Sequence, residues 1–502
     1  MIQFLLNQRL HRESQLDPNT TVLNWLRRTQ QRCGTKEGCA SGDCGACTVV
    51  LAEPAGDRLR YRTVNACITL VSALDGKQLI TVEDLKQRDQ LHPVQQAMVD
   101  CHASQCGFCT PGFVMSLFAL QKQGGQGSTE QALAGNLCRC TGYRPIVAAA
   151  DQLAAQEAAD DQFDQTEAQT LARLKALTAE ASVSGTSASQ PPAVVRQLTH
   201  DGRRCLMPGS LDALAAAYLA EPRARLVAGG TDLALAITQR SQRFPLLISL
   251  NQVPELRAVE QQPHQLAIGA AAPLTDCLPL LRERIPAFAD LLTRFASQQI
   301  RNQGTLGGNL ANGSPIGDAA PVLLALNAAL ELRRGSETRT LPLDDFFLGY
   351  RQTALQPGEF ITRILIPSVT VSQKEAAPTP VNVTTSLFVY KVSKRLEDDI
   401  SAVCAAFSLD IQHGVVHHAR LAYGGMAATP ARAHHTEQAL AGQPWQLATV
   451  ELACRALAED FTPISDFRAG SAYRLQVAQN LLRRAYFEHA APQQIIKVTD
   501  YV

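Results

Sequence analysis

Most of the 14 cysteines in this 502-residue chain lie within its first 140 positions. The N-terminal segment MIQFLLNQRL lacks a basic stretch and a small-residue cleavage site, so we expect a cytoplasmic protein without a secretory signal. In a reducing compartment, clustered cysteines indicate metal ligands rather than disulfides. Lys plus Arg and Asp plus Glu number 46 each, and this balance favours neither nucleic acid nor a membrane surface as partner. The longest apolar stretch, residues 319–330, is too short to cross a bilayer.

The first cysteine motif contains Cys39, Cys44 and Cys47 in the run GTKEGCASGDCGACTVV, and Cys67 follows later in the chain. The spacing C-x4-C-x2-C with one distant cysteine is that of a plant-type ferredoxin loop around a [2Fe–2S] cluster. The glycines of the run allow the loop to wrap tightly, so that backbone N–H groups can point at the cluster sulfides. The alternative is a structural zinc site, which usually has two CxxC hooks and far less glycine.

The second motif combines Cys106 and Cys109 in SQCGFCTPGF with Cys138 and Cys140 in GNLCRCTGYRP. A CxxC followed much later by CxC is unusual for zinc and suits a second compact two-iron site. We expect a helix to begin near Pro111, and the positive partial charge at its start would stabilise the neighbouring thiolates. The other cysteines are predicted to be ordinary packing residues: Cys33, Cys101, Cys205, Cys277, Cys404 and Cys454.

The patterning along the chain predicts a multidomain α+β protein. Residues 1–84 have the pattern of a small β-rich domain, and residues 85–158 that of a helical domain. Residues 159–195 are rich in Ala, Gln, Ser and Thr and end in SVSGTSASQPP, so we interpret them as a linker. Residues 196–375 mix short strands, helices and glycine-rich turns. A Ser/Pro/Thr-rich stretch separates them from a last α+β domain at 383–495.

Local signals predict individual elements within the first two domains. A hairpin is expected from Ile2–Leu6 and the segment after Gln8, and another across the turn at Gly56. A short helix over 21–29, capped by Asn19 or Thr20, is expected between the two hairpins. Further expectations are a strand at 79–82 and helices that begin at Pro93, at Pro111, at Ser128 or Thr129, and at Pro145.

Two glycine-rich stretches follow the predicted linker: LVAGGTDLAL from Leu226 and RNQGTLGGNLANGSPIGDAAP from Arg301. Such loops let the backbone approach a pyrophosphate and direct N–H groups at it. Thr305 and Asn309 can donate hydrogen bonds to a ligand, and Asp318 can accept them from ribose or adenine. Neither stretch matches GxGxxG, so a Rossmann fold is disfavoured. A plain tight turn is the alternative for each stretch taken alone.

The two cysteine motifs, in this order and spacing, resemble the N-terminal third of the molybdenum hydroxylases, the xanthine dehydrogenase and aldehyde oxidase family. The resemblance implies a β-grasp ferredoxin-like domain followed by a four-helix domain, with one [2Fe–2S] cluster in each. The glycine-rich stretches resemble the FAD-binding domain of the same family, an α+β domain that is not a Rossmann fold. The segment with YGGMA from Tyr423 resembles the family's α+β flavoprotein C-terminal domain, so the resemblance covers nearly the whole chain.

The resemblance also implies which residues contact the cofactors. A third stretch, YKVSKRLEDDIS, resembles the family segment that lines the flavin, and residues 395–399 match a charged loop tied to acceptor choice. Leu396 departs from the arginine of animal members, which leaves the acceptor open, and a solvated charge run is the alternative for this loop. The implied cluster ligands are Cys39, Cys44, Cys47, Cys67, Cys106, Cys109, Cys138 and Cys140. The implied FAD contacts are Leu226, Val227, Ala228, Gly229, Gly230, Thr231, Asp232, Leu233, Phe295, Thr305, Gly308, Asn309, Asp318 and Lys391.

The combination of cofactors indicates the kind of function. An iron–sulfur cluster passes one electron at a time, hydride chemistry with NAD moves two, and a flavin can do both. Two clusters in series with a flavin therefore need a two-electron donor, for which this chain leaves no room. The resemblance implies the small subunit of a split bacterial xanthine dehydrogenase, bound to a molybdopterin large subunit in a dimer of heterodimers. That complex would convert hypoxanthine and xanthine to urate and reduce NAD⁺.

Two other functions stay open at this point. The chain could serve a molybdenum hydroxylase that acts on an aldehyde or an N-heterocycle, or one that uses oxygen as acceptor. Carbon monoxide and nicotine enzymes usually keep the cluster and flavin parts on separate chains, so the fusion seen here favours the xanthine type. The other alternative is a scaffold protein that binds structural zinc and has no redox function. Such a protein would be colourless, whereas an iron–sulfur flavoprotein is reddish-brown.

Overall fold

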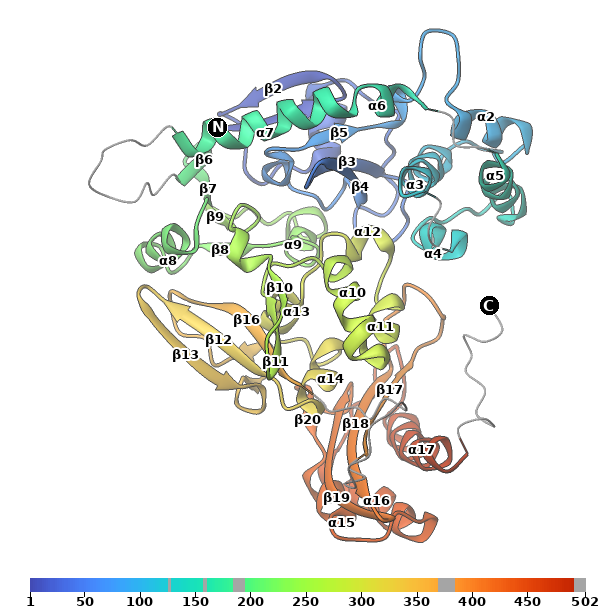
Figure 1. The fold of residues 1–502 in the computed structure, drawn as a ribbon, viewed down its shortest axis with the longest axis vertical. Coiled ribbons are helices and arrows are strands. Elements are labelled where there is room, and N and C mark those ends of the chain that lie inside the picture. Colours follow the sequence, from blue (N-terminus) through green and yellow to red (C-terminus); the bar gives the residue numbers. More distant parts are fainter. Residues whose placement is uncertain (125–127, 157–159, 184–194, 369–383, 492–502) are drawn as a thin grey trace.

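The computed structural model describes residues 1–124, 128–156, 160–183, 195–368 and 384–491. The chain forms an elongated stack, with the cysteine-rich domains at one end, the glycine-rich domain in the middle and the last α+β domain at the other end (Figure 1). This multidomain α+β arrangement is the predicted fold class. In the described ranges, no helix is both long and apolar enough to cross a membrane.

The N-terminal domain is a five-stranded sheet in the order β2-β1-β5-β3-β4, which pairs β1 with β5 in parallel and the other neighbours antiparallel. A short helix and a π-helical turn pack on it through the fully buried Trp25. Thr21 caps this helix by accepting from the Asn24 amide, so the prediction of Asn19 or Thr20 as the cap was wrong. The elements are β1 (Ile2–Leu6), β2 (Arg9–Glu13), α1 (Val22–Asn24), the π-helix (Trp25–Thr29), β3 (Thr48–Ala55), β4 (Arg58–Asn65) and β5 (Gln78–Ile80).

Four helices follow, and they begin within one residue of the predicted positions. Proline in the first turn explains three of these starts, because its missing N–H would have no helical partner there. Ser128 caps the remaining helix by accepting from the Gln131 amide. The predicted strand at 79–82 is shorter, since β5 ends at Ile80 and a 3₁₀ turn starts at Val82. The helices are α2 (Pro93–Asp100), α3 (Thr110–Lys122), α4 (Thr129–Leu133) and α5 (Arg144–Ala155).

Residues 159–195 are predicted to be a linker with some helix at its start, and the structure shows that the helical part extends much further than this prediction. Residues 162–183 form α6 (Gln162–Gln165) and the long α7 (Glu167–Val183), which runs along the N-terminal sheet (Figure 1). Leu171, Leu174 and Leu177 recur every three residues, lie on one face and join the core shared by both cysteine-rich domains. The polar composition was misleading because it describes only the outer faces of α7. Residues 184–194 lie outside the described part of the chain.

The glycine-rich domain contains two larger sheets, one mixed and one antiparallel, a two-stranded antiparallel sheet of β14 and β15, and helices packed between and around them. The first sheet has the order β6-β7-β9-β8 and the second the order β10-β11-β16-β12-β13. Its helices carry the two glycine-rich loops, as described below. The strands are β6 (Val195–His200), β7 (Arg203–Pro208), β8 (Arg225–Val227), β9 (Leu246–Ser249), β10 (Val259–Gln261), β11 (Gln265–Gly269), β12 (Ala329–Arg334), β13 (Glu337–Pro342), β14 (Phe347–Gly349), β15 (Gln352–Thr353) and β16 (Glu359–Pro367). The helices are α8 (Leu211–Ala220), α9 (Leu233–Thr238), α10 (Leu274–Arg284), α11 (Pro286–Thr293), α12 (Gln298–Arg301), α13 (Leu306–Ala311) and α14 (Ala319–Ala325).

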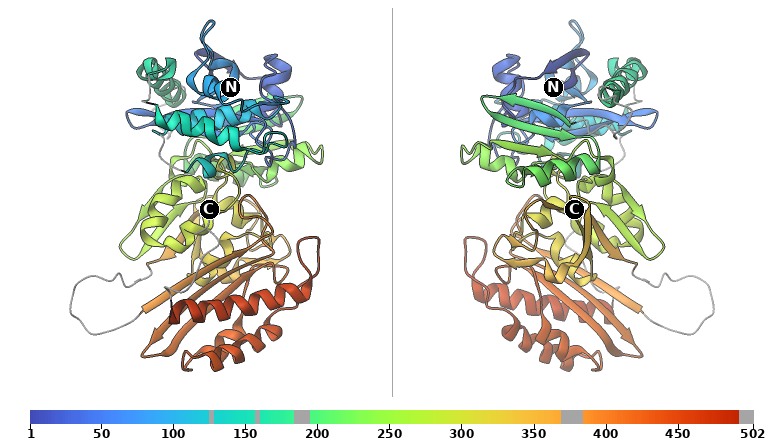
Figure 2. Two further views of the ribbon diagram at one scale, coloured as in Figure 1. Left: turned by 90° about the vertical axis from the view of Figure 1, so that its right-hand side faces the viewer. Right: turned by 90° about the vertical axis from the view of Figure 1, so that its left-hand side faces the viewer.

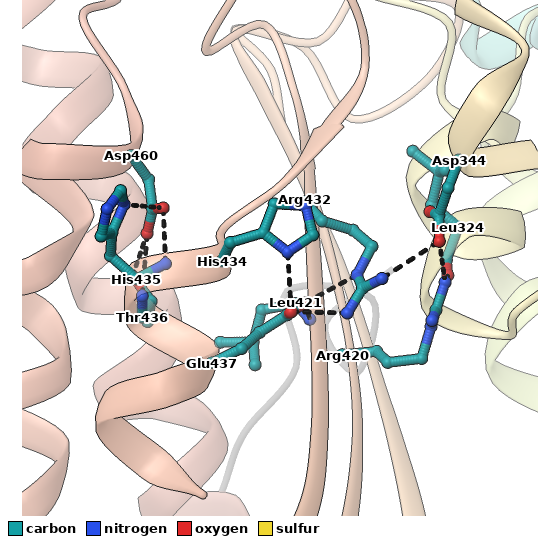
Figure 3. A network of polar contacts seen from close by, with 10 residues as sticks. All are labelled: Leu324, Asp344, Arg420, Leu421, Arg432, His434, His435, Thr436, Glu437 and Asp460. Atoms are coloured by element: carbon teal, nitrogen blue, oxygen red, sulfur yellow. Dashed lines mark hydrogen bonds and ion pairs between the residues drawn. The ribbon is translucent and has the colours of Figure 1, made fainter.

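The last domain is a four-stranded antiparallel sheet with three helices on one face (Figure 2). An ionic network joins it to the middle domain: Arg420 and Arg432 both donate to Asp344, at 2.8 and 3.0 Å (Figure 3). Arg432 also binds both oxygens of Glu437, which fixes the start of α15 against the sheet. The elements are β17 (Thr384–Val392), β18 (Val403–Gln412), β19 (Val415–Gly424), β20 (Ala431–Arg432), α15 (His434–Leu440), α16 (Leu447–Asp460) and α17 (Ser471–Ala490).

If α7 is part of the core, Leu174→Ala will lower the free energy of unfolding by about 2–4 kcal/mol, because it leaves a cavity under a side chain that is 0% exposed. Guanidinium chloride titration followed by circular dichroism measures the change. Lys175→Ala on the exposed face of the same turn is the matched control and should have little effect. Equal effects of the two substitutions would contradict the packing of α7.

Candidate functional site

The first four predicted cluster ligands converge at one end of the N-terminal sheet. Cys39, Cys44 and Cys47 lie in the loop that leads into β3, and Cys67 follows β4. The Cys39 sulfur is hydrogen-bonded with the thiols of Cys44 and Cys67, and Cys67 is hydrogen-bonded with Cys47 as well. The structure therefore brings together all four residues that the spacing singled out.

Backbone N–H groups surround the sulfur of Cys39. It accepts from the amides of Ser41, Asp43 and Cys44 at 3.4, 3.3 and 3.4 Å. Hydrogen bonds from the Cys44 and Cys67 thiols and from Ser41 hold the pKa of Cys39 well below its ordinary value. Such a ring of donors stabilises negative charge on sulfur, as an anionic cluster requires.

The second four ligands meet at the start of α3. Cys106 is hydrogen-bonded with Cys140, and Cys109 with Cys138. Cys138 accepts from the Thr141 amide at 3.4 Å; burial raises its pKa, but the hydrogen bonds from Thr141 outweigh burial and lower the pKa overall. Cys106 and Cys140 are exposed, whereas Cys138 is buried, so this site opens to solvent on one side.

The residues at both sites suit a two-iron cluster. Four cysteine thiols come together at each site, and a [2Fe–2S] cluster is held by four thiolates, two on each iron. Gly38 leaves the necessary space, since a Cβ there would lie 2.8 Å from the Cys44 sulfur. The chemistry and placement of the donors fit the clusters.

The two cluster loops are in direct backbone contact. The amide of Leu137, next to the ligand Cys138, donates to the carbonyl oxygen of the ligand Cys44 at 3.0 Å. Asn136 donates to the Gly45 carbonyl at 3.1 Å. Gly45 has a positive φ of 66°, and a Cβ at this position would lie 2.2 Å from a backbone oxygen of the other loop. Only glycine permits this approach.

The two glycine-rich stretches of the middle domain also lie against each other. A Cβ on Gly229 would lie 1.9 Å from the carbonyl oxygen of Gln303, so the backbones touch at this point. The first stretch runs from β8 into α9, and Thr305 in the second stretch caps α13. The Oδ1 atom of Asn309 is buried without a hydrogen-bond partner. A close pair of glycine-rich backbones beside an unpartnered acceptor fits a dinucleotide such as FAD.

The predicted contacts Asp318 and Lys391 form a buried ion pair. Lys391 Nζ lies 2.8 Å from Asp318 Oδ2, with side chains that are 2% and 5% exposed. The hydroxyl of Ser401 donates to the other Asp318 oxygen at 2.6 Å. We expected the Asp318 carboxylate to accept from ribose or adenine, but both of its oxygens already accept from the protein. Sequence reasoning missed Ser401, which no motif marks.

The charged loop at 395–399 lies beside these residues. Arg294, at the end of α11, donates to the carbonyl oxygens of Lys391 and Leu396 and so ties the loop to the middle domain. Sequence reasoning missed Arg294 as well. Burial, together with the negative charge of Asp43 in the first cluster loop, raises the pKa of Asp398 to about 6. The charged loop and the first cluster loop are therefore within electrostatic reach of each other.

Further contacts join the first cluster loop to the glycine-rich stretches. Gln239, which follows α9, donates to the carbonyl oxygens of Cys39 and Ala40 at 3.0 and 2.9 Å. Thr69, two residues after the ligand Cys67, donates to the side-chain oxygen of Gln303 at 3.0 Å. The residues that we assigned to the first cluster and to FAD thus form adjoining sites.

Comparison with protein families assigns each domain. Residues 6–72 match the 2Fe-2S iron-sulfur cluster binding domain, and residues 81–151 match the [2Fe-2S] binding domain. Residues 200–369 match the FAD binding domain in molybdopterin dehydrogenase, and residues 388–489 match the CO dehydrogenase flavoprotein C-terminal domain. These matches confirm the predicted cofactors, two [2Fe–2S] clusters and FAD.

Full-length relatives match nearly the whole chain. Xanthine dehydrogenase of Drosophila pseudoobscura is 34% identical over 96% of this chain, and aldehyde oxidase 2 of Cavia porcellus is 34% identical over 92%. The chain spans 39% and 38% of the length of these relatives.

Solved structures match more than half of this chain. A chain of carbon monoxide dehydrogenase from Hydrogenophaga pseudoflava has a TM-score of 0.51 and 28% identity, and covers 56% of this chain and 94% of its own length. A chain of quinoline 2-oxidoreductase from Pseudomonas putida 86 has a TM-score of 0.51 and 25% identity, with 58% and 97% covered.

Replacing Cys138 with serine will remove one of two [2Fe–2S] signals in the EPR spectrum of the reduced protein and leave FAD bound, because this ligand belongs to the site farther from the glycine-rich loops. Iron content should fall by about half. Cys33→Ser is the control, since Cys33 is exposed and contacts neither site. Survival of both signals in Cys138→Ser would contradict the ligand assignment.

Gly229→Ala will abolish retention of FAD, because its Cβ would collide with the Gln303 carbonyl and separate the two loops. The measurement is the ratio of flavin to protein after gel filtration, with the EPR signals of both clusters as a check on folding. Gly470→Ala, at a position with a φ of −76° where the nearest atom to the added Cβ lies 3.9 Å away, is the control for glycine replacement remote from these loops.

Proposed function

The chain corresponds to the iron–sulfur and FAD portion of the molybdenum hydroxylases, the xanthine dehydrogenase and aldehyde oxidase family, and on this basis we propose that it is the electron-transfer subunit of a xanthine dehydrogenase. Its partner carries molybdopterin and oxidises hypoxanthine and xanthine to urate. Clusters carry single electrons, and FAD collects two of them for transfer to NAD⁺. The partner and this chain form a dimer of heterodimers.

One observation carries the proposal: the three predicted cofactor sites form an unbroken series of contacts. The second cluster site is exposed at Cys106 and Cys140. Its loop is hydrogen-bonded to the first cluster loop from Leu137 to Cys44, and the first cluster loop is hydrogen-bonded to the segment after α9 through Gln239. Electrons therefore enter at the second cysteine motif, pass to the first and leave through FAD.

The surface around the second site suits a protein partner. Phe108 and Leu137, which flank its ligands, are 48% and 46% exposed, and Tyr143 in the same loop region is 39% exposed. Exposed aromatic and aliphatic side chains next to a redox centre favour a docking surface, because a partner that covers them also brings its own centre close. We assign this face to the molybdopterin subunit.

The proposed FAD site comprises the two glycine-rich loops, Phe295 and the Asp318–Lys391 pair. The backbone loops hold the pyrophosphate, and the buried pair fixes β17 and the charged loop next to it. NAD⁺ reaches the flavin beside residues 395–399, where the loop is held by Arg294.

A second candidate is the equivalent subunit of a hydroxylase for an aldehyde or an N-heterocycle, or one that reduces oxygen. The solved chains of carbon monoxide dehydrogenase and quinoline 2-oxidoreductase cover 56% and 58% of this chain. The fusion of cluster and flavin domains supports the xanthine and aldehyde types together, since xanthine dehydrogenase of Drosophila pseudoobscura and aldehyde oxidase 2 of Cavia porcellus both match more than nine tenths of this chain.

The purified chain should be reddish-brown, contain about four irons and one FAD, and oxidise NADH with an artificial dye while failing to oxidise xanthine. Xanthine turnover by the chain alone would contradict the proposal that xanthine is oxidised on a separate partner subunit.

Affinity purification from its host should recover one large partner that contains molybdenum. Assays of that complex with xanthine, an aldehyde and quinoline, each with NAD⁺ or oxygen, then distinguish the first candidate from the second.

A further inference from the structure

Arg301 is a deeply buried cation beside the predicted FAD contact Phe295. It ends the single turn α12 and is 2% exposed. Its guanidinium donates to the carbonyl oxygens of Phe295, at 3.2 Å, and Ala296, and also to the side-chain oxygen of Gln298 at 3.1 Å. Its Nε is buried without a hydrogen-bond partner. One side chain thus holds both carbonyls of the corner that presents Phe295.

The corner that Arg301 holds is strained. Ala296 has a φ of 51°, a left-handed conformation that is strained for a residue with a Cβ. Such a conformation persists only where the surroundings impose it. Here two features impose the left-handed conformation. Arg301 donates hydrogen bonds to the carbonyl oxygens of Phe295 and Ala296, and Ser297 caps α12 immediately after them.

The charge of Arg301 has no direct counter-ion in the described part of the chain. No carboxylate there lies within ion-pair distance of its guanidinium, and the acidic groups that act on it are Glu397 and Asp398 of the charged loop. Burial lowers its pKa to about 10, so it stays protonated at neutral pH. A glycine at 296 and a neutral side chain at 301 would build the same turn without strain or a buried charge.

From this geometry we infer that Arg301 is a positioning residue for the flavin: it fixes Phe295 at the FAD site by holding the carbonyl oxygens of Phe295 and Ala296. The inference rests on the proposed FAD site and adds a residue that does not itself contact the cofactor. Its position explains why the strain is retained. Strained backbone concentrates at sites where a ligand needs one fixed arrangement.

Arg301→Lys and Arg301→Gln test the inference. Lysine keeps the charge but cannot donate to three acceptors in one plane, so both variants should bind FAD at least tenfold more weakly than the parent, measured by equilibrium dialysis against free FAD. The visible circular dichroism of the bound flavin should change, because the ring loses its fixed surroundings. Arg284→Gln, which removes a surface ion pair with Glu283, is the matched control and should leave both quantities unchanged.

Ala296→Gly separates positioning from general stability. Glycine accepts the left-handed conformation without strain, so the single variant should bind FAD normally. In the Arg301→Gln background, Ala296→Gly should restore part of the lost affinity for FAD, because the left-handed conformation at position 296 is then no longer strained and depends less on the hydrogen bonds from Arg301. The EPR signals of both clusters report whether each variant has folded.

Two results would overturn the inference. One is that both Arg301 variants bind FAD with the affinity and the flavin circular dichroism of the parent. The other is that Ala296→Gly restores none of the FAD affinity lost in Arg301→Gln. If Arg301→Gln fails to fold, Arg301→Lys and its double variant with Ala296→Gly decide the question by the same measurements. A parent chain that binds no FAD would instead contradict the proposed function, so the two failures are distinguishable.

Discussion

The buried side chain of Gln299 is the contact on which the arrangement of the three cofactor-binding domains depends. Its amide nitrogen donates to the Thr48 hydroxyl, the Ser116 hydroxyl and the Asn136 side chain at 3.1–3.4 Å. These partners belong to the N-terminal sheet and to the helical domain. A buried polar group left without a partner costs about 1–3 kcal/mol. A shift of one domain against another would break these hydrogen bonds and leave the Gln299 amide or its partners unpaired, so this cost opposes the shift. The same contacts hold the N-terminal sheet, the helical domain and the α12 turn in one arrangement.

The helical turn that carries Gln299 also serves its other neighbours. Ile300 approaches the first cluster loop, where a Cβ on Gly42 would lie 3.2 Å from it. Arg301 holds the corner at Phe295, and the next residue, Asn302, donates to the Thr63 carbonyl of β4 at 2.9 Å. Consecutive residues of a helix point in different directions, so one short turn can reach every domain that takes part in electron transfer.

Local patterns predicted the cluster ligands and most elements, because ligand spacing, proline at helix starts and glycine at tight turns are properties of adjacent residues. They could not predict Ser401 as a partner of Asp318, or Gln299 as a partner of Thr48, since these pairs are separated by 83 and 251 positions. The cap at Thr21 was missed by one residue. The helix α7 was taken for a linker because its leucines are outnumbered by small and polar residues that face solvent.

The solvent-facing thiols of the second cluster site have a consequence for how the protein is assembled. Iron and sulfide can reach Cys106 and Cys140 only while no other protein covers them, so cofactor loading has to come before docking. In that interval the cluster is open to oxygen and peroxide, which attack accessible iron–sulfur centres. If the proposed partner docks on this face, a cell that makes this chain in excess of that partner would accumulate a damaged form, and balanced synthesis of the two would protect it.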